Sequence, residues 1–279
     1  MVYLFTRLCE LRMGLNYLGG VEAGCLASVT GRLAVVHLRE VGVTTTQWTA
    51  IFTTISTLPP HHMELDFSNN NLSMVRPAIL AAAVVRVERV RLMSTKLTRV
   101  QSSAIINAIC TNFGEIKELN LMFNNLSGIE PDHLATAAEH LVKLNLGWTK
   151  LRPNHIRSIF ERLDQGEGQV EELRLSGVGV QELEPGLFGR VVSRLVLADL
   201  NFTGLQGSQV AALILEMKEG TNLRELIVSR NDLSHIDSHG LRDAVKNLDR
   251  INLSETNLSF RQASIILNQF SEVDQYEVN

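Results

Sequence analysis

The chain has few cysteines and few aromatic residues. Its 279 residues include three cysteines, Cys9, Cys25 and Cys110, and aromatic residues make up 5% of the sequence. An odd number of scattered cysteines excludes a disulfide framework as the main source of stability, and no Cys-x-x-Cys spacing indicates a metal or redox site. We expect Cys110, at the end of a helical segment, to be a small buried hydrophobic residue.

The chain also lacks a long hydrophobic run and an excess of either charge. Although 45% of the residues are hydrophobic, no run approaches the roughly 18 to 20 apolar residues that span a bilayer, so we expect no membrane insertion. The formal net charge is −4, whereas a general nucleic-acid or anionic-membrane binder carries a basic excess. The composition is that of an ordinary soluble chain of one or two domains.

Common catalytic motifs are absent from the sequence. There is no phosphate-binding glycine loop followed by Lys and Ser or Thr, no Gly-x-Ser-x-Gly and no His-Glu-x-x-His. The nearest approach to a metal site is His235, Asp237 and His239, in a predicted loop with no regular register to bring the three side chains together. We therefore expect no enzymatic activity, no metal site and no cofactor.

One short apolar pattern recurs along the whole chain. The pattern is apolar-x-x-apolar-x-apolar-x-x-Asn/Thr-x-apolar, and its eleven places are called positions one to eleven below. Ten copies begin near residues 8, 33, 62, 87, 116, 141, 170, 192, 223 and 248. Ten copies in one chain exclude chance, and an internal repeat of this length predicts a solenoid.

The intervals between the repeat starts carry a second period. They are 25, 29, 25, 29, 25, 29, 22, 31 and 25 residues, so the first six alternate within a larger unit of 54 residues. Position nine alternates as well. It is Asn in most of the first class of unit (Asn16, Asn70, Asn124, Asn231) and Thr in most of the second (Thr95, Thr149, Thr256). The units that start near 170 and 192 break the alternation.

This pattern resembles the leucine-rich-repeat family over essentially the whole chain. The long, alternating units are most similar to the ribonuclease-inhibitor-like subclass, which also forms the sensor ends of nucleotide-binding immune receptors. The chain departs from ribonuclease inhibitor in being neither cysteine-rich nor strongly acidic. The resemblance implies an α/β horseshoe, with a parallel β-sheet on the concave face and helices on the convex face, in one domain spanning residues 1–279.

The repeat chemistry explains that architecture. Positions four and six point to one face of a short strand, and identical strands stack in parallel. Residues 102–109 and 154–160 have helical apolar spacing after plausible N-caps, and Pro77 and Pro131 stand where a helix would begin. Asn at position nine can bond unpaired backbone groups where the chain turns. We expect this ladder to be interrupted at Val41, Val178 and Leu200.

The ends of the chain leave two interpretations open. The first residues align with the tail of a return segment, so Val2, Leu4 and Phe5 would face an absent neighbour; the chain is then either a fragment or complete with a minimal cap. An exposed first repeat could also stack on a second copy of the chain. Residues 260–270 are predicted to form the last helix, and residues 271–279 a polar, acidic tail.

The sequence favours a cytoplasmic location over secretion. Five sites match the glycosylation pattern, at Asn71, Asn125, Asn201, Asn252 and Asn257. However, the repeat itself tends to place Asn-Leu-Ser just past the turn, and no signal peptide precedes Leu8. Secretion stays open if a leader has been removed.

The candidate site lies on the concave face. Positions two, three, five, seven and eight face this surface or its rim and have no role in the core. Phe123 and Trp148 share position eight in adjacent units, about 5 Å apart between backbones. The predicted binding residues are Arg91, Met93, Asn120, Met122, Phe123, Asn145, Trp148 and Arg174. The aromatic rings either form the hot spot of an interface or simply pack on each other.

Charges on the predicted concave face nearly cancel, with twelve acidic and eleven basic residues. This balance argues against a highly basic ligand and against nucleic acid. We therefore predict a non-enzymatic module that binds a protein partner on its concave surface, centred on residues 87–175. Two alternatives stay open: the ligand-sensing region of a larger, immune-type receptor, and a regulator or inhibitor of an enzyme or small GTPase.

Overall fold

The computed structural model describes residues 8–59, 61–112, 115–166 and 168–271, in which ten short strands alternate with ten helices. The strands are β1 Glu10–Arg12, β2 Val35–His37, β3 His61–Asp66, β4 Val87–Arg91, β5 Glu118–Asn120, β6 Lys143–Asn145, β7 Glu172–Arg174, β8 Leu197–Asp199, β9 Glu225–Ile227 and β10 Arg250–Asn252. The helices are α1 Ala23–Thr30, α2 Thr45–Thr57, α3 Pro77–Val84, α4 Arg99–Thr111, α5 Pro131–Glu139, α6 Pro153–Gln165, α7 Pro185–Arg194, α8 Gly207–Glu219, α9 Ser238–Val245 and α10 Phe260–Ser271.

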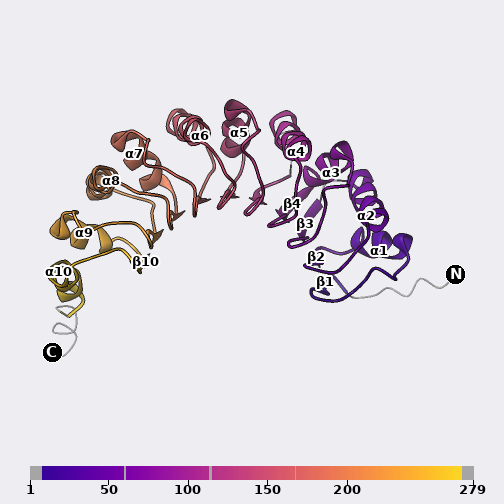
Figure 1. Cartoon of the computed structure of the whole chain (residues 1–279), viewed down its shortest axis with the longest axis horizontal. Coiled ribbons are helices and arrows are strands. Elements are labelled where there is room, and N and C mark those ends of the chain that lie inside the picture. Colours follow the sequence, from indigo (N-terminus) through magenta and orange to yellow (C-terminus); the bar gives the residue numbers. More distant parts are fainter. Residues whose placement is uncertain (1–7, 60, 113–114, 167, 272–279) are drawn as a thin grey trace.

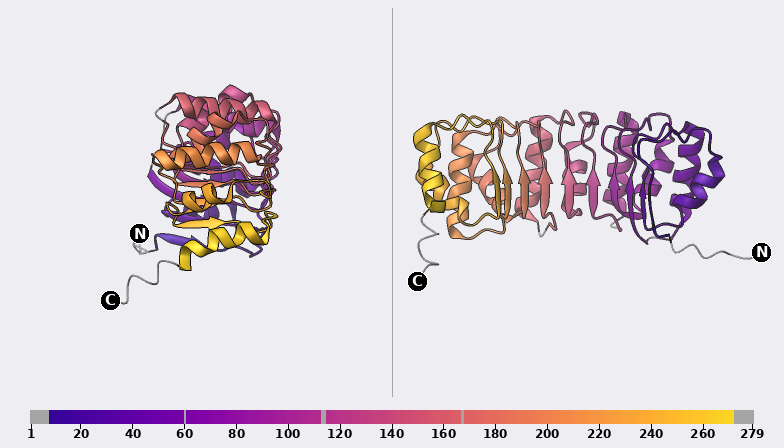
Figure 2. Two further views of the ribbon diagram at one scale, coloured as in Figure 1. Left: turned by 90° about the vertical axis from the view of Figure 1, so that its left-hand side faces the viewer. Right: turned by 90° about the horizontal axis from the view of Figure 1, so that it is seen from below.

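The strands form one open sheet in chain order, from β1 to β10, and every pairing is parallel. The molecule is an arch with the strands along its inner side and the helices along its outer side (Figure 1). Seen from below, the strands lie side by side across the concave face (Figure 2). The predicted horseshoe is confirmed. A helix is wider than a strand, and this difference makes the helical side convex.

The core lies between the sheet and the helices. The position-four residue of the strands points into it; Leu119 and Leu144 are 2% exposed, while their strand neighbours are half-buried. Position six, for example Leu121, is fully buried in the following turn. This is the two-residue alternation that the apolar pattern predicts.

The predicted helical segments are confirmed. Residues 102–109 lie in α4, 154–160 in α6 and 260–270 in α10. Pro77 and Pro131 are the first residues of α3 and α5, where the missing proline N–H has no partner to lose. None of the helices in the described ranges is long and apolar enough to cross a membrane.

The eighth repeat begins three residues later than the sequence pattern indicates. In the sheet, Leu173 pairs with Ala198, so Ala198 stands at position four and the unit starts at Leu195, not near residue 192. The sequence pattern indicates the wrong register here for two reasons. Ala198 is smaller than the usual residue at position four, and Leu195 and Leu197 have the spacing of positions four and six. The corrected intervals from residue 170 onwards are 25, 28 and 25 residues, so the alternation continues, with Thr203 at position nine.

In alternate repeats, the asparagine at position nine bonds to the preceding repeat. Asn124 donates to the carbonyl of Leu92 in the preceding unit at 2.7 Å and accepts from the backbone N–H of Leu97 at 3.1 Å. Asn231 makes equivalent bonds, and Asn70 donates to the carbonyl of Leu38 but accepts from the N–H of Val41, at position nine of the preceding unit. Val178 supplies no polar group, as expected.

Of the other two expected interruptions, the one at Leu200 is wrong, whereas Val41, like Val178, has no polar side-chain group. The N–H of Val41 is accepted by Asn70, so the connection between these two units is made by the neighbouring side chain. Leu200 stands at position six, and the hydroxyl of Thr203, at position nine, donates to the carbonyl of Leu200.

A second ladder, absent from the sequence pattern as we described it, recurs about every 54 residues in the first turn of alternate helices. Its members are Gln47, Gln101, His155, Gln209 and Gln262. The amide of Gln101 donates to the carbonyls of Leu72 and Val75, both at 2.7 Å, and its oxygen accepts from the N–H of Thr98 at 2.8 Å. The side chain thus caps its own helix and binds the preceding repeat.

The expectations about the chain ends fall largely outside the described ranges. Val2, Leu4 and Phe5 are not described, nor are residues 272–279 of the predicted tail. Ser271, the first residue of that predicted tail, is the last residue of α10.

Candidate binding surface on the concave face

Position eight has the same unusual backbone in every repeat. Its φ lies between 54° and 69°, in the left-handed region that favours Gly and Asn. The residues there are Leu15, Glu40, Asn69, Ser94, Phe123, Trp148, Gly177, Phe202, Arg230 and Glu255. The turn is therefore a property of the fold, whereas large aromatic side chains are not what this backbone prefers.

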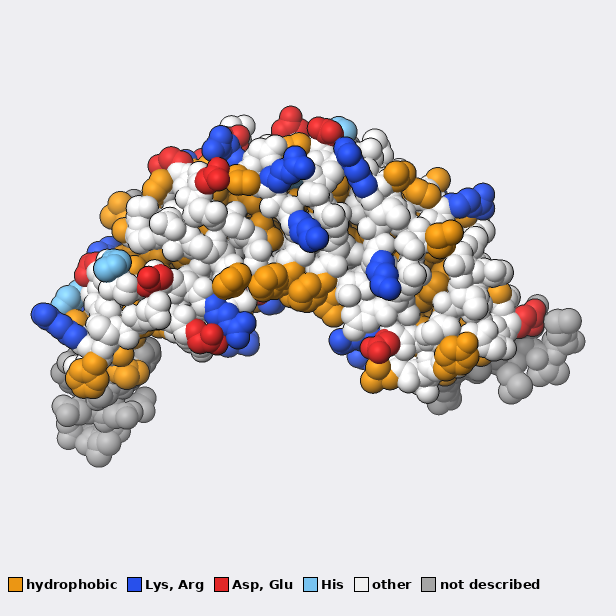
Figure 3. All heavy atoms as spheres, in the orientation of Figure 1, with side chains coloured by type: hydrophobic (Ala, Val, Ile, Leu, Met, Phe, Trp, Pro, Cys, Tyr) orange, Lys and Arg blue, Asp and Glu red, His pale blue; other side chains and the backbone are white. Residues whose placement is uncertain are grey.

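Three of these residues form a continuous row of rings, called the aromatic row: Phe123, Trp148 and Phe202. The rings of Phe123 and Trp148 stack with centroids 6.1 Å apart and planes 12° from parallel, and those of Trp148 and Phe202 stack at 5.6 Å and 16°. Their exposed fractions are 52%, 37% and 54%. Hydrophobic side chains gather in a row along the inner rim at the middle of the arch (Figure 3).

Gly177 allows Trp148 to reach Phe202 across an intervening strand. A Cβ atom at Gly177 would lie 2.4 Å from Cδ2 of Trp148, a distance that no side chain could occupy without moving the ring. The indole therefore lies over the glycine of the next repeat. Because the other repeats form the same left-handed turn with larger residues, it is the close approach of Trp148 that requires glycine at this point of the row.

Sequence reasoning found two members of the aromatic row and missed the third. Phe202 escaped because the eighth repeat was placed three residues too early, which put Asp199 at position eight. The signal was present in the spacing: starting that unit at Leu195 restores the alternating intervals and places Thr203 at position nine. Asp199 stands instead at position five, opposite Arg174.

The eight predicted residues all lie on this surface. Arg91, Asn120, Asn145 and Arg174 occupy position five of neighbouring strands β4 to β7. Met93 and Met122 are half-buried in the turns that follow β4 and β5. With Phe123 and Trp148 on the rim, the structure brings the predicted set together as one surface; its binding role stays a prediction.

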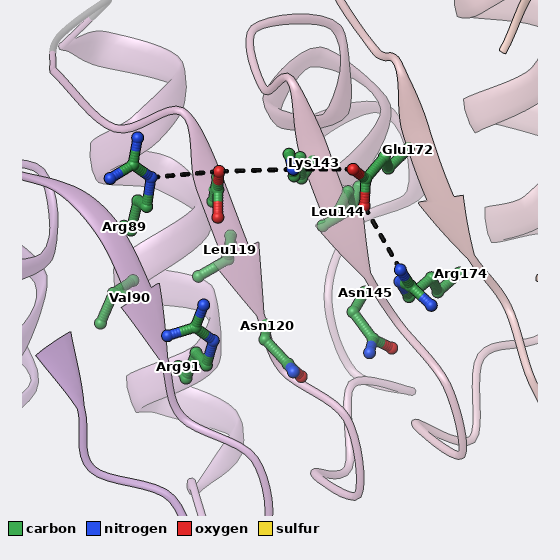
Figure 4. A pocket seen from close by; sticks show the side chains of 11 residues that line it. Arg89, Val90, Arg91, Leu119, Asn120, Lys143, Leu144, Asn145, Glu172 and Arg174 are labelled. Atoms are coloured by element: carbon green, nitrogen blue, oxygen red, sulfur yellow. Dashed lines mark hydrogen bonds and ion pairs between the residues drawn. The ribbon is translucent and has the colours of Figure 1, made fainter. Parts of the chain in front are cut away.

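Position three carries a chain of ion pairs across the same strands (Figure 4). Arg89 donates to Glu118 at 3.1 Å, and Lys143 lies 2.7 Å from Glu172 and 3.8 Å from Glu118. The hydrogen bond from Lys143 to Glu172 raises the pKa of the lysine, against the effect of its partial burial. Because these charges alternate along the row, they largely neutralise one another.

Glu64 of β3 is shared by side chains from the strands on both sides. It accepts from His37 at 2.9 Å and from a guanidinium nitrogen of Arg91. Burial acts to raise the pKa of Glu64, but the bonds from Arg91 and His37 outweigh burial and hold this pKa below its ordinary value. Glu64 is therefore ionised at neutral pH and fixes one side of Arg91.

A shallow pocket of about 210 Å³ lies over β4 to β7 and is lined by residues of positions three, four and five (Figure 4). Asn120 and Asn145 form part of this lining. Their side-chain oxygens accept from the backbone N–H groups of Met122 and Gly147, both at 3.0 Å. These bonds direct the amide NH₂ groups, which are donors, away from the turns.

Asp237, one of the three residues considered as a metal site, has a structural role. Asp237 caps α9 by accepting from the N–H groups of His239 and Gly240, both at 3.1 Å. Within the described ranges, no three His, Cys, Asp or Glu side chains are grouped to hold a metal ion. Cys110 is half-buried, burial raises the pKa of its thiol, and its sulfur lies 3.2 Å from the carbonyl of His133.

Comparison with known proteins supports the fold. No protein-family model matches the chain, and no curated protein matches it. The solved structure of the leucine-rich repeat-containing protein LegL7 from Legionella pneumophila is similar, with a TM-score of 0.54 and 16% identity. That match covers 96% of this chain and 90% of LegL7.

Two receptor structures also match, both with a TM-score of 0.45. TLR13, solved with ssRNA13, is 17% identical, and the match covers 94% of this chain and 46% of that one. Toll, from the Toll–Spatzle complex of Drosophila, is 16% identical, and the match covers 90% of this chain and 40% of that one. The chain thus spans less than half the length of either receptor chain.

Proposed function

We propose that this chain, which has the leucine-rich-repeat fold, is a non-enzymatic module that binds a protein partner through the middle of its concave face. One observation carries the proposal. Three stacked aromatic side chains are exposed at position eight, where the fold requires only a left-handed turn. Aromatic residues with arginine nearby dominate the energetics of protein interfaces, and clusters of such residues lie at interface centres.

Self-packing alone is a weaker explanation of the aromatic row. Stacking between two rings contributes about 0.5–1.5 kcal/mol, but a left-handed backbone at a bulky residue costs a similar amount. The repeats near both ends form the same turn with Glu40, Asn69, Arg230 and Glu255. The fold is therefore satisfied without aromatic residues at this position, and their presence needs another cause.

The surroundings of the aromatic row fit the usual layout of a binding site. The position-five residues of β4 to β7 are polar and lie beside it, and the ion pairs of position three lie beyond them. An apolar centre with a polar surround excludes water from the contact when a partner covers it. The alternating repeat length also supports assignment to the ribonuclease-inhibitor-like subclass, as part of this proposal.

The test is a pull-down analysed by quantitative mass spectrometry. The bait is the chain as it stands, compared with the triple variant Phe123→Ala/Trp148→Ala/Phe202→Ala. We expect the variant to lose at least 90% of one or more specifically captured proteins, because each ring contributes about 2 kcal/mol to an interface of this type. Equal capture by both baits would exclude the aromatic row as the binding site.

A matched control removes exposed apolar side chains elsewhere. Val100, Leu215 and Phe260 lie in convex helices and are 65%, 61% and 89% exposed. The variant Val100→Ala/Leu215→Ala/Phe260→Ala also truncates three exposed apolar side chains and should retain the same captured proteins. Loss of capture by this control as well would indicate nonspecific adhesion.

A further inference from the structure

Beside the aromatic row lies a second row, here called the donor row: Arg91, Asn120, Asn145 and Arg174, at position five of β4 to β7. The two asparagine oxygens are occupied by the turns that follow their strands. Among the described residues, the Asn120 NH₂ group has no hydrogen-bond acceptor, and that of Asn145 faces only the sulfur of Met122, at 3.9 Å. The row therefore presents hydrogen-bond donors to the open face.

The two arginines at the ends of the donor row are partly free. Arg91 gives one guanidinium nitrogen to Glu64, and Arg174 gives one to Glu172 at 3.3 Å. Glu172 is itself shared with Lys143. The side chains of Arg91 and Arg174 are 37% and 35% exposed. Each guanidinium has five N–H donors in a planar fork and can still bind a carboxylate with two parallel bonds.

The donor row is bounded by acids. Asp66 of β3 pairs in register with Arg91, and Asp199 of β8 pairs with Arg174. Read across the strands, position five is Asp, Arg, Asn, Asn, Arg, Asp. The complementary ligand carries a negative charge over each arginine, no charge between them, and no negative charge over the aspartates. This pattern describes a short segment, since a longer polyanion would meet Asp66 and Asp199.

We propose that the donor row and the aromatic row together bind an extended peptide segment of the partner, in which two acidic residues lie four residues apart with apolar residues between them. The proposal rests on the proposed function and names the chemistry of the partner. It assigns carboxylates to Arg91 and Arg174, and backbone carbonyls to Asn120 and Asn145. The apolar side chains contact Phe123, Trp148 and Phe202.

Dimensions agree with this arrangement. Arg91 and Arg174 are three strands apart, which is about 14 Å at the usual strand spacing, and four residues of extended chain span about 13.5 Å. Successive side chains of an extended peptide point to opposite sides. Acidic side chains can therefore face the donor row while the alternate, apolar side chains face the rim where the aromatic row lies.

The same observations disfavour single-stranded RNA, which also combines negative charge with stacking on aromatic rings. A groove for RNA has basic charge along the whole path of the backbone. Here the position-three charges cancel in pairs, and the donor row ends in aspartates on both sides. The surface fits two localised carboxylates rather than a continuous line of phosphates.

The test measures binding of fluorescein-labelled peptides by anisotropy at low salt. The probe is Gly-Glu-Leu-Ser-Leu-Glu-Gly, with matched peptides in which both Glu are replaced by Gln or by Lys. We expect the Glu peptide to bind at least tenfold more tightly than the Gln peptide, and the Lys peptide not to bind. No binding of the Glu peptide at millimolar concentration, or equal affinity for the Gln peptide, would overturn the proposal.

Protein variants then assign the effect to the donor row. Arg91→Gln/Arg174→Gln should weaken the Glu peptide at least tenfold and leave the Gln peptide within threefold. Arg12→Gln changes the same repeat position in β1, outside the row, and should have no effect. Loss of binding to both peptides alike in the double variant, or an equal loss with Arg12→Gln, would contradict the assignment.

A variant that preserves the fold by design gives the opposite change. Asp66 and Asp199 accept from the N–H groups of Ser68 and Asn201 at 3.0 and 3.1 Å, and Asn120 and Asn145 make the same bond with an amide oxygen at the same position. Asp66→Asn/Asp199→Asn should therefore fold normally and bind the Glu peptide at least threefold more tightly. Unchanged or weaker binding would contradict the proposed charge pattern.

The outcome can be separated from that of the proposed function. If the aromatic-row variant loses its captured protein while the Glu and Gln peptides bind alike, the chain is a binding module with a partner of another chemistry. A 12-nucleotide oligouridylate is included as competitor. Tighter binding of this RNA than of the Glu peptide would overturn the peptide assignment in favour of a nucleic-acid ligand.

Discussion

Two periodic features of this molecule differ in what they serve. The inter-repeat network consists of the buried ladders Gln47, Gln101, His155, Gln209 and Gln262, and Asn70, Asn124 and Asn231. The aromatic row is Phe123, Trp148 and Phe202. Members of the network are at most 8% exposed, and their polar groups bond backbone atoms of a neighbouring repeat. Members of the row are at least 37% exposed and contact one another.

The difference separates positions whose side chains the fold requires from positions whose side chains are free to serve a function. Replacing a Gln or Asn of the network by a side chain that cannot make its bonds leaves buried backbone groups with fewer partners, whereas His155, in the place of a Gln, still bonds the carbonyl of Ile129. At position eight the backbone is equally fixed, but the side chain points outwards and can be acidic, basic, small or aromatic. Function can therefore be encoded at position eight at little cost to the fold.

The largest expected change in stability comes from breaking the network. Gln101→Leu leaves the carbonyl of Val75 and the N–H of Thr98 without partners, and the carbonyl of Leu72 keeps only its bond from the N–H of Val75. Equilibrium unfolding in urea should show a loss of about 3 kcal/mol, since each buried unpaired group costs about 1–3 kcal/mol. Asn107→Ala, on the exposed side of the same helix, should change stability by less than about 0.5 kcal/mol. Equal effects of the two changes would contradict this role.

A smaller loss is expected from Gly177→Ala, which acts on both features at once. The new methyl group must displace the ring of Trp148, and the left-handed backbone adds about 1–2 kcal/mol of strain. Gly204→Ala is a matched control, because Gly204 has φ of +68° and its nearest neighbour is Gln181 at 3.3 Å. Only Gly177→Ala should change the near-ultraviolet circular dichroism. An identical spectrum in both variants would show that Trp148 does not lie over Gly177.

The network can also be extended at its gap. Val178 stands where Asn124 and Asn231 form bonds to the preceding repeat, and it is 2% exposed. Val178→Asn should add a bond to the N–H of Leu151 and stabilise the chain by about 1 kcal/mol. The reverse change, Asn124→Val, should cost about 2 kcal/mol because Leu92 and Leu97 lose a partner. Destabilisation by Val178→Asn would mean that the gap is required by local packing.

The smallest effect is expected at the concave ion pairs. The pKa of Glu64 is lower in the folded chain than in the unfolded chain. The stability that the ionised carboxylate contributes is therefore complete above the unfolded pKa of about 4.3, and it is lost as the pH falls through the lower, folded pKa. Glu64→Gln should cost less than about 1 kcal/mol at pH 7. The difference from wild type should disappear under acid, in unfolding curves measured from pH 7 to pH 2.5. A difference that persists at pH 2.5 would contradict an electrostatic origin.

Much of this architecture can be predicted from the sequence, because the residues that recur in the apolar pattern are the ones that form the core. The parallel strands, the helix starts at Pro77 and Pro131, and the placement of Phe123 beside Trp148 all follow from it. The sequence predicts the eighth repeat three residues too early, because Ala198 at position four is small and Leu195 and Leu197 have the same spacing as positions four and six. Phe202 was lost with that register.

The polar contacts were harder to predict for a physical reason. Gln101 and Gln209 recur regularly, but a single Gln every 54 residues has no meaning until the preceding turn is known to lie against it. The sharing of Glu64 between His37 and Arg91 depends on side-chain rotamers across three strands. Likewise, Trp148 reaches Phe202 only because Gly177, which lies between them, has no side chain.

The central claim is that a partner covers the aromatic row, and acrylamide quenching of tryptophan fluorescence tests it most directly. The chain has two tryptophans; Trp48 is buried in the core at 1% exposure, so quenching reports Trp148, which is 37% exposed. Addition of a protein captured in the pull-down, in a tryptophan-free form, should reduce quenching to the level of the Trp148→Phe variant, which retains only Trp48. Unchanged quenching of Trp148 at saturating partner would contradict the account.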